Sequence, residues 1–330
     1  VSGGSDVDGD SVPDVLVGAP YDNRNGTNAG EVRVVSGAGG GTTVQSILGA
    51  AGSYFGYAVA LLDDMDGDGR AESLACAPLF GGIATQQGRA TIHSGLSGAV
   101  LYTIDGDSAF DEFGRAAARI GDLDGDGKRE FVIGEPRAAP GGLFSAGRVL
   151  VYRGSDASLL FAIDGFRYNQ RLGQSVAGAG DLDADGVPDF VAGGTTDDVF
   201  GVDAGVAIAF SGVDGSPLFE MRGDRAGDRF GSCVAEIGDV NGDGFPDVLV
   251  GAPTADRYWG DTGSMLGDES GAAYVVSYDR VAAPGRPIDF IYRGIPVGPP
   301  APVGDADGDG IVDVVVAAIA GFQLPELDVA

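Results

Sequence analysis

Short runs of apolar residues alternate with turns of Gly, Pro and Asp along the whole chain. None of these runs repeats with the 3.6-residue period of an amphipathic helix. Runs rich in Val, Ile, Phe and Tyr that are bounded by such turn residues are typical of β-strands. The pattern therefore predicts an all-β protein built from short strands.

The strand pattern is copied in units of about 58 residues, each marked by an acidic nonapeptide. The first residues of the nonapeptides stand 58, 58, 59, 58 and 66 apart. Four strand-like runs in each unit predict a four-stranded β-propeller blade, whereas a β-helix would need much shorter coils. The nonapeptides are DVDGDSVPD (6–14), DMDGDGRAE (64–72), DLDGDGKRE (122–130), DLDADGVPD (181–189), DVNGDGFPD (239–247) and DADGDGIVD (305–313).

Residues 1–330 are expected to form a single propeller, with six blades favoured over seven because six motifs stand in register. Val1 aligns with Val176, in the middle of a first strand. We expect the first and last blades to meet, because an open ring would expose strand edges. The repeats fall approximately at 1–54, 55–112, 113–171, 172–229, 230–294 and 295–330.

Each nonapeptide carries oxygen side chains at positions 1, 3, 5 and 9, and position 7 offers a backbone carbonyl. Closely spaced carboxylates repel one another unless a hard cation compensates them. Calcium accepts six to eight oxygens, whereas zinc prefers His or Cys and magnesium retains water. No Glu follows at position 12, as an EF-hand requires, so we expect a shorter loop that joins the first and second strands of each blade.

The loops are expected to hold up to six Ca²⁺ ions, which would change the formal charge from −29 to −17. Ser11 replaces the glycine at position 6 of the first loop, where we expect it to strain a left-handed turn. The candidate ligands are Asp6, Asp8, Asp10, Val12 and Asp14; Asp64, Asp66, Asp68, Arg70 and Glu72; Asp122, Asp124, Asp126, Lys128 and Glu130; Asp181, Asp183, Asp185, Val187 and Asp189; Asp239, Asn241, Asp243, Phe245 and Asp247; and Asp305, Asp307, Asp309, Ile311 and Asp313.

Two further motifs flank the acidic loops. A Phe-Gly pair precedes three of them, as at Phe55-Gly56, and a Gly-Ala-Pro end follows others, as at Gly18-Ala19-Pro20. In this order the motifs resemble the FG-GAP repeats of the integrin α-subunit propeller and its bacterial relatives. The resemblance implies a propeller with calcium between the first and second strands of each blade. The fourth repeat departs from it with Gly193-Gly194-Thr195, and the sixth has Gly298-Pro299-Pro300 in place of the Phe-Gly pair.

The composition excludes several classes of function. Acidic residues outnumber basic ones 49 to 20, and such a polyanion repels nucleic acid and anionic lipid. The longest apolar run, 314–320, is too short to span a membrane. His93 is the single histidine, which excludes two-histidine metal sites, and Cys76 and Cys233 are not expected to pair.

Variation among the repeats is concentrated in the loops that join second and third strands, at the end of the blade away from the acidic loops. A constant scaffold with variable loops at one end favours recognition there. The fifth of these loops holds Arg257, Tyr258 and Trp259, the single tryptophan, and this composition is typical of a binding hot spot. A tryptophan folded back over the blade edge is the alternative. The loops are 21–29, 79–87, 137–146, 195–204 and 254–270.

These observations predict an extracellular or cell-surface, calcium-binding propeller that serves as an adhesion or ligand-binding scaffold and is not an enzyme. Its partner would be a protein or a glycan, with no nucleic acid and no insertion into a membrane. A lectin, or a glycoside or phosphodiester hydrolase with its site on the propeller face, is the rival, because propellers also host catalysis.

Overall fold

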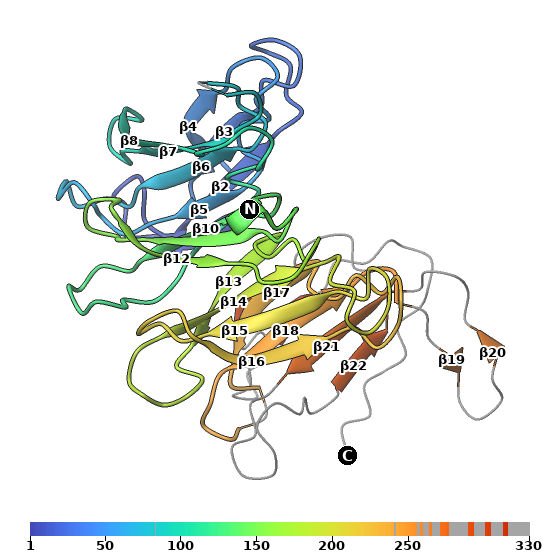
Figure 1. Cartoon of the computed structure of the whole chain (residues 1–330). Helices are drawn as coiled ribbons and strands as arrows, with labels where there is room; N and C mark the ends of the chain where they lie inside the picture. Colours follow the sequence, from blue (N-terminus) through green and yellow to red (C-terminus); the bar gives the residue numbers. More distant parts are fainter. Residues whose placement is uncertain are drawn as a thin grey trace.

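The computed structural model describes residues 1–255 except Ile83 and Asn241, residues 271–276, and the backbone of five short strand segments between 258 and 315. Five four-stranded antiparallel sheets follow one another along the chain, and in each the strands pair in chain order. Figure 1 shows these sheets from blue to orange. The expected all-β fold with four-stranded blades is confirmed.

The strands of the first three blades are β1 (Ser2–Ser5), β2 (Asp14–Ala19), β3 (Glu31–Val35) and β4 (Thr43–Leu48); β5 (Val59–Leu61), β6 (Ser73–Ala77), β7 (Arg89–His93) and β8 (Val100–Asp105); and β9 (Ala116–Arg119), β10 (Phe131–Glu135), β11 (Arg148–Tyr152) and β12 (Leu159–Asp164). One 3₁₀ turn, η1 (Pro140–Gly142), interrupts a loop of the third blade.

The next two blades consist of β13 (Ser175–Gly180), β14 (Asp189–Gly194), β15 (Val206–Phe210) and β16 (Pro217–Arg222), followed by β17 (Cys233–Gly238), β18 (Asp247–Ala252), β21 (Ala272–Val276) and β22 (Phe290–Arg293). Two-stranded pairs are formed by β19 (Tyr258–Trp259) with β20 (Ser264–Met265), and by β23 (Ala301–Gly304) with β24 (Asp313–Val315). No described helix is long and apolar enough to cross a membrane.

The first strands of successive blades lie against one another. β1 contacts β5, β5 contacts β9, and the series continues through β13 and β17 to β23. The hydrophobic core fills the spaces between neighbouring sheets, as where Leu74 and Ile92 of the second blade pack with Phe131 and Ile133 of the third. This arrangement, with first strands inside and cores between blades, is that of a β-propeller.

The Phe-Gly and Gly-Ala-Pro motifs meet across each blade boundary. Gly134, in the second strand of the third blade, lies so close to Gly173 of the next blade that a Cβ would stand 2.0 Å from the Gly173 carbonyl oxygen. Gly18 and Gly56 stand in the same relation. At these two boundaries the glycines are needed because two backbones touch there. In the second blade Cys76 takes this place, and it is buried and free.

The hydrophobic residue of each Phe-Gly pair forms a second boundary contact. It makes an isolated parallel bridge to the glycine that precedes the third strand of the previous blade. Phe113 and Leu172 are at most 1% exposed, so these side chains are buried at the blade boundary, next to the glycine contact. The bridges join Gly30 to Phe55, Gly88 to Phe113, Gly147 to Leu172 and Gly205 to Phe230.

The sixth unit is described only through the backbone of β23 and β24. Six blades, ring closure and the exact repeat boundaries stay predictions.

Candidate functional site

The first five acidic nonapeptides lie where the sequence placed them, between the first and second strands of their blades. The third loop shows how it is built. The two carboxylate oxygens of Asp122 accept hydrogen bonds from the backbone N–H groups of Gly125, at 2.8 Å, and Gly127, at 2.9 Å. Asp126 accepts one from Lys128 N–H at 2.8 Å. The first acid of the loop thus folds the following residues around itself.

Positions 4 and 6 of the loop adopt left-handed backbone conformations. Gly125 has φ 76° and Gly127 has φ 88°. Ser11 stands at position 6 of the first loop with φ 69°, so the expected left-handed serine is present. Ala184 holds position 4 of the fourth loop with φ 55°, a second non-glycine residue in this unfavourable region. The first and fourth loops are therefore the more strained of the described ones.

The acid at position 9 is buried in each of the five described loops. Glu130 is 0% exposed, and its carboxylate accepts hydrogen bonds from Leu123 N–H at 2.5 Å and Gly154 N–H at 3.3 Å. This acid ties the loop both to its own second strand and to the turn after the third strand. The equivalent residues Asp14, Glu72, Asp189 and Asp247 are also 0% exposed.

Burial and crowding make three of the closing acids, Glu72, Glu130 and Asp189, costly to ionise. Desolvation, with repulsion from the other loop carboxylates, raises the pKa of Glu72 to about 7. Desolvation raises the pKa of Asp189 to about 6, against the effect of its backbone hydrogen bonds. Glu72 Oε1 is buried and accepts no hydrogen bond. A bound cation would remove each of these penalties, so the residues present fit a metal ion.

The structure brings the predicted ligands together in four loops. All four side chains of the second loop, Asp64, Asp66, Asp68 and Glu72, have ligand atoms within 4.8 Å of one another. The third loop gathers Asp122, Asp124, Asp126 and Glu130 in the same way. Three of the four side chains meet in the first loop (Asp6, Asp8 and Asp10) and in the fourth (Asp181, Asp183 and Asp189). Asn241 of the fifth loop, and residues 305–312 of the sixth, lie outside the described residues.

Neighbouring loops are also joined to one another, which the sequence analysis did not foresee. The guanidinium of Arg70 donates to the Val7 carbonyl at 3.3 Å and to that of Asp8. The Lys128 ammonium donates to the Asp64 carbonyl of the preceding loop. Both basic residues occupy position 7 of their nonapeptides. This shared position is the feature of the sequence that could have predicted the contacts between loops. The joined loops form one acidic end of the molecule, here called the metal-loop face.

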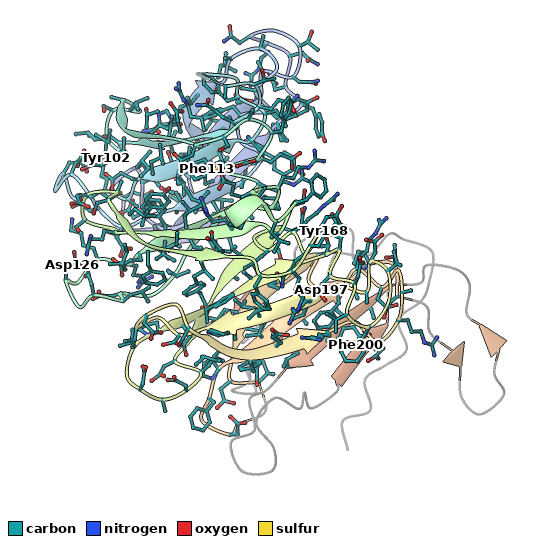
Figure 2. The ribbon with its side chains drawn as sticks, in the orientation of Figure 1. Tyr102, Phe113, Asp126, Tyr168, Asp197 and Phe200 are labelled. Atoms are coloured by element: carbon teal, nitrogen blue, oxygen red, sulfur yellow. The ribbon has the colours of Figure 1, made fainter. Side chains whose placement is uncertain are left out.

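The opposite end, here called the variable face, carries the exposed aromatic side chains. In Figure 2, Asp126 lies at one side of the molecule, whereas Tyr168 and Phe200 lie at the other. Phe144 and Tyr168 are 57% and 64% exposed, and their ring centroids are 5.5 Å apart. Among the described residues, every exposed large aromatic lies on this face: Tyr21, Phe110, Phe144, Phe166, Tyr168 and Phe200.

Half of these aromatics were missed because the connection from each fourth strand to the next blade also reaches the variable face. Phe110, Phe166 and Tyr168 lie on such connections. Of the predicted hot spot, Arg257 lies outside the described residues, and Tyr258 and Trp259 are described only by the backbone of β19.

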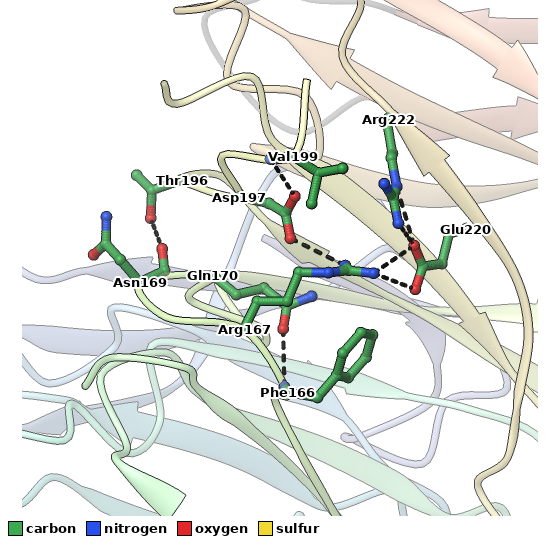
Figure 3. Close-up of polar contacts among 9 residues, drawn as sticks. All are labelled: Phe166, Arg167, Asn169, Gln170, Thr196, Asp197, Val199, Glu220 and Arg222. Atoms are coloured by element: carbon green, nitrogen blue, oxygen red, sulfur yellow. Dashed lines mark hydrogen bonds and ion pairs between the residues drawn. The ribbon is translucent and has the colours of Figure 1, made fainter. Parts of the chain in front are cut away.

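An ion-pair network stabilises the variable face of the fourth blade (Figure 3). Arg167 donates to Asp197 at 3.1 Å and to both carboxylate oxygens of Glu220, at 2.9 and 3.0 Å. Arg222 also pairs with Glu220. Desolvation opposes ionisation of Glu220, but its hydrogen bonds with the two guanidiniums dominate and lower its pKa. The network satisfies its own charges, which indicates a structural role.

Comparison with known proteins agrees with these repeats. A family model described as the FG-GAP repeat matches residues 1–35, 113–152 and 236–276. The chain is 31% identical over 217 residues to integrin alpha-5 of Xenopus laevis, a match covering 61% of this chain and 20% of that protein. It is 32% identical over 190 residues to integrin alpha-PS2 of Drosophila melanogaster, covering 54% of this chain and 11% of that protein. The chain therefore carries FG-GAP repeats and is similar to integrin α-subunits over its propeller region, as the motifs predicted.

The chain thus spans about a fifth or less of the length of these relatives. Among solved structures, a rhamnogalacturonan lyase, YesW, aligns with TM-score 0.46 and 16% identity over 83% of this chain and 55% of the lyase. BBS1N, solved in complex with ARL6DN, aligns with TM-score 0.45 and 10% identity over 97% of this chain and 79% of that chain. Structural likenesses this weak have no bearing on function.

Proposed function

We propose that this protein is a calcium-binding propeller that acts outside the cell or at its surface as a scaffold for binding a protein or glycan, and that it is not an enzyme. The observation that carries the proposal is the recurrence of carboxylate clusters in successive blades, each with a buried closing acid. The similarity to integrin α-subunits supports the adhesive role and the location.

In each loop the oxygen side chains at positions 1, 3, 5 and 9 (carboxylates except for Asn241 of the fifth loop), with the carbonyl at position 7, would hold the ion. Calcium would neutralise the crowded acids when bound. The chain itself contributes the preformed turn, because Asp122 already holds the backbone of Gly125 and Gly127 in place. The buried acid then connects the loop to the following strands.

The variable face is the proposed binding surface. Its exposed aromatics have no counterpart on the metal-loop face among the described residues, where no large aromatic side chain is exposed. Arg257, Tyr258 and Trp259 belong to the longest loop of this face. Once a ligand is known, Trp259→Ala is expected to weaken its binding about tenfold or more without changing the melting temperature in calcium. A fold that melts while affinity survives would make Trp259 a packing residue.

The scaffold role is tested by screening the calcium-loaded chain against glycan arrays and panels of glycoside and phosphodiester substrates. We expect no turnover. Hydrolysis of any glycoside or phosphodiester that scales with protein concentration would replace the scaffold role by the enzymatic one.

A further inference from the structure

A cavity of about 550 Å³ opens on the variable face, between the third, fourth and fifth blades. Its lining comes from the turns before the first strands and from the loops that join second and third strands. Four arginines line it, with two carboxylates: Arg115, Arg137, Arg171, Arg229, Glu112 and Asp203.

The charge of this lining is opposite to that of the molecule. Four guanidiniums face two carboxylates in a chain whose formal charge is −29 and which has one lysine in all. Concentrating arginines in one concave site is unfavourable unless an anion compensates them. The arrangement therefore favours a negatively charged ligand.

Two of the four arginines are already partnered inside the protein. Glu112 lies 3.1 Å from Arg137 and 3.8 Å from Arg115. The guanidinium of Arg115 also stacks over the ring of Tyr57, 4.5 Å from its centroid. These contacts hold one wall of the cavity and use up the charge of Glu112.

The charges of the other two arginines are not compensated by an ion pair among the described residues. Within the part of the chain that the structure describes, neither Arg171 nor Arg229 makes an ion pair within 4.0 Å. Arg171 Nε is buried and donates to no protein acceptor. A buried guanidinium N–H without an acceptor costs free energy that a ligand oxygen would recover.

Arg171 and Arg229 occupy the same place in successive repeats, one residue before Leu172 and Phe230. Both are left-handed, with φ 56° and 52°, and each backbone N–H donates to a loop carbonyl at 3.0 Å. Tyr54 has the same conformation at the same place. The backbone there belongs to the scaffold, so the side chain is free to set specificity.

We propose that this cavity binds a carboxylate side chain of an acidic peptide segment in a partner protein, with Arg171 and Arg229 as its main contacts. The planar fork of a guanidinium matches a carboxylate in two parallel hydrogen bonds. Among the described residues, no aromatic side chain lines the cavity to stack on a sugar ring. This inference rests on the proposed scaffold function and names the chemistry of its partner.

The neighbouring aromatics fit the rest of such a segment. Asn169, which lines the cavity, donates its backbone N–H to the Phe144 carbonyl at 2.9 Å. The exposed pair of Phe144 and Tyr168 therefore stands beside the cavity. Apolar residues next to the acid in a peptide would pack on this pair and exclude water from the ion pair.

The test uses the calcium-loaded chain and a fluorescent peptide in which glutamates alternate with phenylalanines, compared with the same peptide carrying glutamines. Fluorescence anisotropy is expected to show saturable binding of the acidic peptide alone. Arg171→Gln and Arg229→Gln are each expected to raise its Kd about tenfold or more. Arg225→Gln, which removes the same charge four residues from Arg229 but outside the cavity lining, is the matched control and should change Kd less than about twofold.

Several results would overturn the proposal: no saturable binding, equal binding of the glutamine peptide, or an equal effect of Arg225→Gln. Saturable binding of a fluorescent oligogalacturonate, with no binding of the acidic peptide, would assign the cavity to an acidic glycan instead. Melting curves with calcium and with EGTA on the same samples distinguish a failure of the proposed function from a failure of this inference. Unchanged curves mean that the proposed function itself fails, whereas calcium-dependent stability without peptide binding rejects this inference alone.

Discussion

The two ends of the blades are built under different constraints. At the metal-loop face, the five described nonapeptides repeat left-handed residues at positions 4 and 6, a hydrogen bond from the position-6 N–H to the first acid, and a buried closing acid. At the variable face, the corresponding loops share only the glycine and Phe-Gly contacts at the blade boundaries. The comparison teaches that repetition follows chemistry and close packing, and that the remaining positions are left free for recognition.

The two ends also differ in charge. Acidic side chains dominate the metal-loop face, while the cavity of the variable face gathers arginines. Calcium would offset the first imbalance, and an acidic ligand would offset the second. The two faces can therefore be disturbed separately.

The largest effect on stability is expected at the glycine contacts between neighbouring blades. A Cβ at Gly134 would stand 2.0 Å from a backbone oxygen of the next blade, so Gly134→Ala should destabilise the fold by about 3 kcal/mol or more. Cys76→Ala, at the equivalent place in the second blade, removes one buried sulfur and should cost about 1 kcal/mol. Urea unfolding of both variants measures the difference, and equal costs would refute the glycine contact.

A smaller effect is expected from charge reversal in a metal loop. Asp126→Lys should remove one calcium site and about 2.7 kcal/mol of stability when calcium stands at a hundred times its Kd. Asp10→Lys should cost less, because the left-handed Ser11 already strains the first loop. Asp156→Lys is the control, since this exposed acid lies on the same face outside the nonapeptides. The loss of stability is measured by calorimetric unfolding in calcium. A larger loss for Asp10→Lys than for Asp126→Lys would contradict the account.

Glu135 is a buried acid that belongs neither to a metal loop nor to the lining of the cavity. It is 2% exposed at the end of β10, and desolvation, with repulsion from Asp111, raises its pKa to about 8. Its ordinary value is 4.5, so the unfolded chain ionises first, and the penalty grows as pH rises from 4.5 to about 8. Glu135→Gln should therefore stabilise the protein, and the gain should be largest above pH 8.

The same variant should match the wild type only well below pH 4.5, where the carboxyl is protonated in both states. Melting temperatures at constant saturating calcium across this range give the measurement. A gain from Glu135→Gln that does not change with pH would show that its cause is packing.

The smallest effect on stability is expected at the exposed aromatics. Phe144→Ala and Tyr168→Ala should leave the melting temperature within about 1 °C, because both side chains are more than half exposed. Each should raise the Kd of the acidic peptide several-fold, which corresponds to a loss of about 1 kcal/mol of binding free energy. Loss of stability with unchanged binding would turn the aromatic pair into a packing element and separate it from the cavity.

The repeated features could be predicted from the sequence, since each motif places its own neighbours. The nonapeptides predicted the position of each metal loop that the structure describes, and the left-handed Ser11 followed from its alignment with glycine. The cavity could not be predicted, because Arg115, Arg137 and Arg171 stand at three different points of their repeats. Only the packing of blades brings them together, although the equivalence of Arg171 and Arg229 was visible in the aligned repeats.

The central claim is that calcium in the loops stabilises the whole propeller. The most direct measurement is the melting temperature of the full chain with saturating calcium and after exchange into excess EGTA, at the same pH and ionic strength. We expect a steep drop in EGTA that is restored by adding calcium back, because the buried acids would otherwise repel one another. An unchanged melting temperature would contradict the claim and leave the acidic loops as turns without a metal.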